Sequence, residues 1–124
     1  MADEITVIAG LRCSKSNLLV SHNTLQSVFT MSGDATSRNV QSIPTTAAGT
    51  ALSIAAAVGT AGYAFFRNLD ATNFVEIGVQ VGGTFYPVIK LKAGEYGVCR
   101  FSVLTLYARS DTAATLLDMS MIED

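Results

Sequence analysis

Hydrophobic and polar residues alternate along much of this chain with a period of two, which is typical of β-strands. The first run covers residues 5–11, where Ile5, Val7 and Leu11 alternate with other residues. Further strand-like runs cover residues 17–20, 24–31, 38–43, 51–54, 63–68, 74–81, 84–92, 96–101, 104–108 and 113–122. This series of short strands with regular turn signals predicts an all-β sandwich or barrel.

Two strong turn signals divide the second half of the chain. Asn68, Asp70 and Asn73 can fold their side chains back onto nearby backbone amides, which favours a turn. Gly82 and Gly83 supply the positive φ that a two-residue hairpin needs. Both signals indicate antiparallel strands joined by tight connections.

Weaker signals set the other boundaries. Residues 21–23, Ser-His-Asn, predict a turn, and Gly94 lies in an Ala-Gly-Glu turn. Pro44 cannot donate to a strand ladder and therefore ends an edge strand. Residues 55–62 form a loop of small residues, and a short helix over 51–58 is the alternative.

Length and composition favour one domain over residues 1–124, with partners on its surface. Hydrophobic residues make up 49% of the chain and charged residues only 15%. Surface charge normally keeps monomers apart, so its scarcity favours an oligomer or a larger assembly. The net charge is -2 and no run of Lys and Arg occurs, which argues against nucleic-acid binding. The apolar stretch over 47–64 is too short and mixed to cross a membrane.

Candidate catalytic, cofactor and metal sites are absent from the sequence. His22 is the sole histidine, no GxSxG or phosphate-binding glycine motif occurs, and the carboxylates lie mostly in turns. Cys13 and Cys99 lie in apolar runs, which predicts buried free thiols, with a disulfide as the alternative. The sequence therefore favours a structural or binding protein over an enzyme.

Several segments resemble small virion proteins of tailed bacteriophages. They are NLDATNFVEIG at residues 68–78, IKLKAGE at 89–95, LYARSDTAATLLD at 106–118 and the opening MADEITV. The resemblance implies a non-enzymatic virion protein with a single antiparallel, jelly-roll-like β-sandwich. It also implies residence in the virion after assembly in the host cytoplasm, and a major capsid protein or other virion proteins as partners.

Within that resemblance, we expect a capsid decoration (cement) protein that forms a homo-oligomer, with a trimer favoured. A tail, neck or fibre-attachment component of the same particle is the first alternative. A carbohydrate-binding β-sandwich is an alternative of another class, for which Tyr86, Tyr96 and Tyr107 are the available aromatic residues.

Both ends of the chain have the pattern of strands, and terminal strands fray unless a sheet or a partner holds them. Residues 1–12 and 113–124 are possible arms that reach a neighbouring subunit. Their contact residues would be Ile5, Val7, Leu117, Met119 and Met121. The alternative is that both segments are internal strands of the sandwich.

Overall fold

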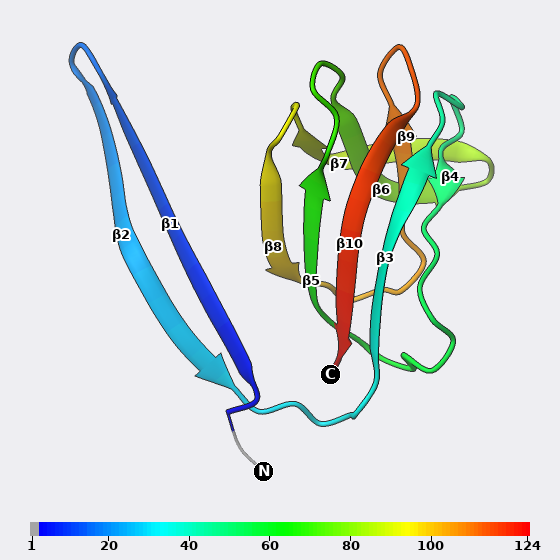
Figure 1. The fold of residues 1–124 in the computed structure, drawn as a ribbon, viewed down its shortest axis with the longest axis horizontal. Helices are drawn as coiled ribbons and strands as arrows, with labels where there is room; N and C mark the ends of the chain where they lie inside the picture. Colours follow the sequence, from blue (N-terminus) through cyan, green and yellow to red (C-terminus); the bar gives the residue numbers. More distant parts are fainter. Residues whose placement is uncertain (1–2) are drawn as a thin grey trace. The chain divides into compact units, whose positions relative to one another are not determined.

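The computed structural model describes residues 3–124, and over this range the chain forms ten β-strands and no helix. The described residues accordingly include no helix that is long and apolar enough to cross a membrane. The contacts divide the chain into two compact units, one ending at Ser32 and one covering Gly33–Asp124, whereas the sequence suggested one domain. Each unit is visible in Figure 1.

The first unit is an antiparallel hairpin of β1 (Ile5–Lys15) and β2 (Leu18–Phe29). Lys15 pairs with Leu18, so Ser16 and Asn17 make a two-residue turn, and Ser16 has a positive φ of 52°. Positive φ at the first turn position matches the twist of the two strands, which is why such turns suit hairpins.

The predicted turn at residues 21–23 is wrong, because β2 runs through these residues without a break. His22 lies opposite Leu11 in the ladder, and the register shifts between Ala9 and Leu11. The extra residue of β2 is therefore absorbed as a β-bulge instead of a turn. Polar residues tolerate this position because they are exposed there.

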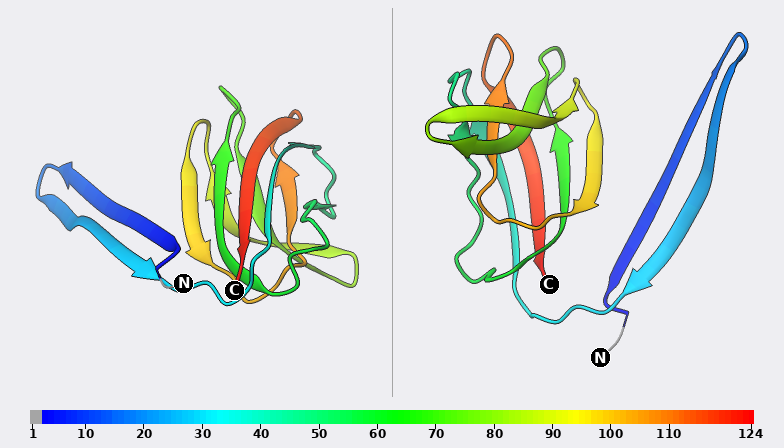
Figure 2. Two further views of the ribbon diagram at one scale, coloured as in Figure 1. Left: turned by 60° about the horizontal axis from the view of Figure 1, so that its bottom comes forward. Right: turned by 180° about the vertical axis from the view of Figure 1, so that it is seen from behind.

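The second unit contains two antiparallel four-stranded sheets, which confirms the predicted all-β antiparallel class. The first sheet has the order β3-β10-β5-β8, formed by Thr36–Ile43, Thr115–Glu123, Ala61–Asn68 and Tyr96–Arg100. The second has the order β4-β9-β6-β7, formed by Thr50–Ala51, Tyr107–Ser110, Val75–Val81 and Thr84–Leu91. Figure 2 shows this unit from two further sides.

One hydrophobic core joins the two sheets face to face. Phe66, Leu117 and Met119 contribute from the first sheet, and Ile77 and Ala108 contribute from the second. Their side chains are at most 2% exposed. The alternation seen in the sequence thus places one side of each strand in a shared interior, as in a sandwich.

Two segments form less strand than their patterns predicted. The expected strand over 51–54 is reduced to Thr50–Ala51, residues 55–60 remain irregular, and the alternative helix does not form. The expected strand over 104–108 begins only at Tyr107. Leu52 and Leu106 are nevertheless buried. In these two segments the apolar pattern therefore predicted which residues are buried, but not their secondary structure.

The C-terminal segment is an internal strand and not a reaching arm. β10 lies between β3 and β5 in the first sheet, and Leu117, Met119 and Met121 are buried in the core. The N-terminal candidate arm differs: its residues 1–2 lie outside the described residues, and its remainder belongs largely to β1 of the hairpin.

The edge strand β7 carries two features that interrupt its ladder. Pro87 lies within this strand, where an edge position tolerates the missing N–H. The register against β6 shifts between Ile77 and Gly78, so that Val88 is the extra residue, and its side chain is 77% exposed. Gly78 faces the backbone of Tyr86 too closely for any Cβ to fit.

Candidate interaction surface

The hairpin of the first unit has one predominantly apolar face. Directly paired residues of an antiparallel ladder point to the same side, and side chains alternate between the sides along each strand. The ladder therefore gathers nine apolar side chains on one side, with Ile5 and Phe29 paired at the base of the hairpin. We call the other seven the ribbon face: Val7, Ala9, Leu11, Cys13, Leu18, Val20 and Leu25. Ser27, His22 and Lys15 share that side.

The ribbon face is largely exposed to solvent. Leu11, Leu18 and Leu25 are 63%, 67% and 68% exposed, whereas Ile5, at the base of the hairpin, is buried. Large apolar side chains that lie together on one surface usually mark a site of interaction. The ribbon face is therefore the main candidate interaction surface of this chain.

The opposite side of the hairpin is mixed in character. The register places Thr6, Arg12, Ser14, Ser21 and Gln26 there. Three apolar residues, Ile8, Leu19 and Val28, are interspersed among them. The two sides of the ribbon therefore differ in polarity, and the apolar stripe lies on one of them.

Gly10 keeps the two strands of the hairpin close at the bulge. A Cβ at this position would lie 3.1 Å from Oγ1 and 3.2 Å from Cα of Thr24. Both distances are shorter than an ordinary van der Waals contact. The small residue at this site therefore helps to maintain the register on which the ribbon face depends.

Charged groups mark the two ends of the hairpin. At its base, Oε2 of Glu4 accepts a hydrogen bond from the backbone N–H of Met31 at 3.2 Å. This bond lowers the pKa of Glu4 below its ordinary value of 4.5. At the turn, Lys15 adds a positive charge on the side of the ribbon face.

The predicted turn residues Asn68, Asp70 and Asn73 form one hydrogen-bonded cluster. Oδ1 of Asn68 accepts from the N–H of Asp70 at 2.9 Å, and Oδ1 of Asp70 accepts from the N–H groups of Thr72 and Asn73 at 2.7 and 2.6 Å. The bonds from Asn73 and then Thr72 lower the pKa of Asp70. These side chains shape the backbone of the turn.

The predicted turn glycines all adopt left-handed backbone conformations. Gly82 and Gly83 have φ values of 57° and 81° and join β6 to β7, where Val81 pairs with Thr84. Gly94 has a φ of 77°, and its N–H donates to the carbonyl of Asn68. Glycine adopts this conformation without the steric cost that a Cβ brings.

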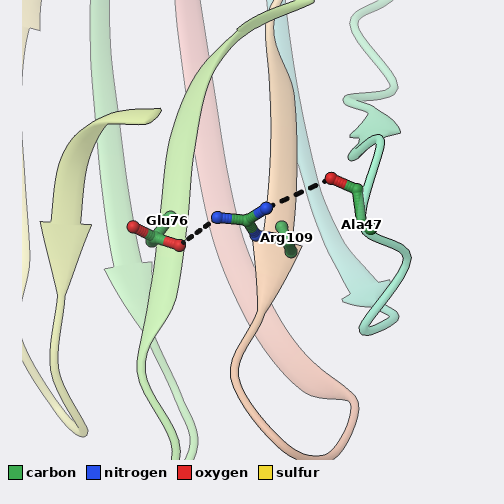
Figure 3. A network of polar contacts seen from close by, with 3 residues as sticks. All are labelled: Ala47, Glu76 and Arg109. Atoms are coloured by element: carbon green, nitrogen blue, oxygen red, sulfur yellow. Dashed lines mark hydrogen bonds and ion pairs between the residues drawn. The ribbon is translucent and has the colours of Figure 1, made fainter. Parts of the chain in front are cut away.

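Arg109 connects the second sheet to the segment that precedes β4 (Figure 3). Its guanidinium donates to Oε1 of Glu76 on β6 at 2.8 Å and to the carbonyl of Ala47 at 3.1 Å. It also lies 5.0 Å from the centre of the Phe85 ring. The contacts of the Arg109 guanidinium are therefore structural.

Both cysteines are exposed and free, so the prediction of buried thiols is wrong. Cys13 lies on the hairpin, where no second layer covers it within the part of this unit that the structure describes. Cys99 lies on the edge strand β8 and lines an apolar hollow of about 370 Å³ with Phe66, Leu91 and Phe101, among others. An apolar strand pattern reports which side chains share a face, but not whether that face is covered.

The remaining candidate groups do not come together in one place. Tyr86 and Tyr107 belong to the second sheet and Tyr96 to the first, where Tyr96 stacks on Phe65 with 6.2 Å between ring centres. His22 is exposed on β2. Among residues 3–124, no group of three or more His, Cys, Asp and Glu side chains is placed to hold a metal ion.

No protein-family model matches the chain, and neither the search of curated proteins nor the search of solved structures finds a match to it.

Proposed function

We propose that this chain is a non-enzymatic structural subunit of a larger assembly, and that the assembly is the virion of a tailed bacteriophage. In this role it decorates the capsid as a cement protein and contacts the major capsid protein or other virion proteins. The ribbon face supports the role of a subunit in a larger assembly, because it exposes a stripe of large apolar side chains. The virion assignment rests on the sequence resemblance given above.

The strand order of the second unit supports a jelly-roll version of the sandwich. Strands β3, β10, β5 and β8 form one sheet and β4, β9, β6 and β7 the other, so consecutive strands mostly cross between sheets. Such double-sheet arrangements of eight strands occur in viral capsid proteins and also in lectins. A rigid sandwich of this kind suits a subunit that transmits force through a shell.

We propose a homo-oligomer as the working form, with a trimer expected from the resemblance. Many copies on one lattice turn weak individual contacts into strong attachment, because each further contact is effectively intramolecular. A tail, neck or fibre-attachment role in the same particle uses the same properties. A carbohydrate-binding module is less well supported, because its three candidate tyrosines are divided between the two sheets.

Labelling of intact particles tests this function. Antibody against the chain, applied to purified particles of the phage whose genome encodes it, should decorate the head in a regular array. Labelling at the neck or tail would select the alternative position. Absence of the chain from washed particles, together with binding to a glycan array, would instead select the carbohydrate-binding role.

A further inference from the structure

We infer that the ribbon face is a self-association surface, covered by the ribbon face of a second copy of this chain. The inference deepens the proposed function and rests on it for its biological setting, since a subunit that stiffens a shell needs contacts between copies. The surface consists of Val7, Ala9, Leu11, Cys13, Leu18, Val20 and Leu25.

A two-stranded ribbon is marginally stable by itself in water, and it usually needs another layer against its apolar side. Among the described residues of the first unit, β1 and β2 form a sheet of two strands without a third. Leu11, Leu18 and Leu25 each expose more than 60% of their surface on the same side. The second layer that this side requires is therefore an apolar surface of similar length and width.

The ribbon face of another copy meets this requirement in shape and polarity. Beside the ribbon face, charges are found at the ends of the hairpin, with Asp3 and Glu4 at the base and Lys15 at the turn, whereas Arg12 lies on the opposite side. Antiparallel packing of two ribbons places the basic turn of each beside the acidic base of the other. Parallel packing would place like charges together, which costs free energy. The charges thus favour an antiparallel pair.

The size of the face indicates a weak contact. The eleven residues of β1 extend over roughly 35 Å, and two strands about 5 Å apart present a face about 10 Å wide. The plan area is therefore roughly 350 Å² per copy, well below the ~800 Å² per partner of a standard interface. We expect pairing that depends on protein concentration and that links copies two by two, in addition to any trimer formed through other surfaces.

Cys13 provides a natural probe, because its thiol lies on the ribbon face and is exposed in the single chain. The experiment measures the rate of maleimide alkylation of Cys13 in full-length Cys99→Ser protein, from low micromolar to near-millimolar concentration. Where nine-tenths of the copies are paired, the rate should fall about tenfold, because only unpaired copies react. Light scattering over the same range should show the mean mass rising.

Two variants make the result specific to this face. Cys13→Ser with Ser14→Cys, in the same Cys99→Ser background, moves the thiol to the opposite side of β1, and its rate should not change with concentration. Leu11→Ser with Leu25→Ser should keep Cys13 fast at every concentration. The core of the second unit contains neither leucine, so thermal unfolding checks that unit alone. Slow hydrogen exchange of the backbone amides of β1 and β2 checks that the hairpin of the variant is folded.

Three results would overturn the inference. A Cys13 rate that is fast at all concentrations would show that the face stays uncovered. A slow rate at all concentrations, together with a monomer mass by light scattering, would show that the same chain covers it. Equal protection of the thiol at position 14 would place the contact on another surface. Concentration-dependent protection of Cys13, combined with absence of the chain from particles, would refute only the proposed function.

Discussion

Nδ2 of Asn68 donates a hydrogen bond to the backbone carbonyl of Leu91, 23 residues further along the chain, at 3.1 Å. The same nitrogen donates to the carbonyl of Asn73 at 2.8 Å. Asn68 is fully buried, and it thereby connects the end of β5 on one sheet to the end of β7 on the other. A side chain that a local turn pattern identified also joins the two layers of the sandwich.

Replacing Asn68 by Ala should destabilise the second unit by about 2–4 kcal/mol, because buried backbone groups lose their partners. Urea unfolding monitored by circular dichroism measures this change. Thr72→Ala is the control, since Thr72 is exposed and its hydroxyl makes local contacts with its near neighbours Asp70 and Asn73. Equal stability of the two variants would contradict the role assigned to Asn68.

Gly83→Val should cost about 1–2 kcal/mol, because a β-branched residue adopts a φ of 81° poorly. No atom lies within 4 Å of a Cβ built at Gly83, so the cost comes from the backbone conformation and not from a clash. Gly97→Ala is the matched control, since its nearest neighbour, Cδ2 of Leu91, is 3.9 Å away. Thermal melting should separate the two variants, and a wild-type melting temperature for Gly83→Val would refute the hairpin geometry.

Glu123 should make the stability of the second unit sensitive to acid. Its carboxylate accepts from the N–H groups of Gly59 at 2.8 Å, Ala35 at 3.2 Å and Asp34 at 3.1 Å. The bond from Gly59, followed by that from Ala35, lowers the pKa of Glu123 below its ordinary value of 4.5. A lowered carboxyl pKa stabilises the folded state above the unfolded value, and this stabilisation is lost as the pH falls through the native pKa.

Glu123→Gln should therefore flatten the decline of stability as the pH falls below about 4.5. Denaturant unfolding at a series of pH values measures this slope. Asp111→Asn is the control, because Asp111 is an exposed carboxylate whose backbone N–H is bonded to Phe74. An unchanged acid slope in Glu123→Gln would show that the carboxylate does not carry the effect.

Arg109→Met should destabilise the second unit by about 1–2 kcal/mol, because Glu76 loses its ion-pair partner and the carbonyl of Ala47 loses a donor. Hydrogen exchange should also become faster in the segment before β4. Arg38→Met is the matched control: Arg38 is 77% exposed and lies 3.7 Å from Asp118, so its removal should cost less than about 0.5 kcal/mol. Similar losses in both variants would refute the structural role of Arg109.

The fragment Gly33–Asp124 should fold without the hairpin, because every residue of the hydrophobic core cluster lies within it. Its melting temperature should stay within a few degrees of that of the full chain. Two-dimensional NMR of the fragment provides the measurement. A fragment with collapsed amide dispersion would show that the hairpin is needed to fold the sandwich.

The features that the sequence predicted well depend on local chemistry. Gly82 and Gly83, and the cluster around Asp70, adopt their conformations through backbone freedom or through hydrogen bonds over two or three residues. The alternation of Leu117, Met119 and Met121 likewise follows one strand and gives its buried side. Such patterns can be read without knowing which strands lie beside one another.

The features that the sequence did not reveal depend on partners distant along the chain. Ser21, His22 and Asn23 look like a turn, but the ladder with β1 keeps them extended and absorbs the mismatch beside Gly10. Residues 5–11 and 117–122 show the same alternation, although one strand lies in the hairpin and the other in the sandwich core. Alternation specifies a two-sided strand, and only the tertiary fold decides what covers it.

Pro87 and the exposed Val88 also affect how this protein behaves when many copies are crowded together. An uninterrupted edge strand is a template on which foreign strands can add, and this is how fibrils are seeded. In the second sheet one edge, β4, is only two residues long, and the other, β7, is broken by the proline and its neighbouring bulge. Neither edge offers a continuous template, so local concentration can rise at a surface without this sheet growing into an aggregate.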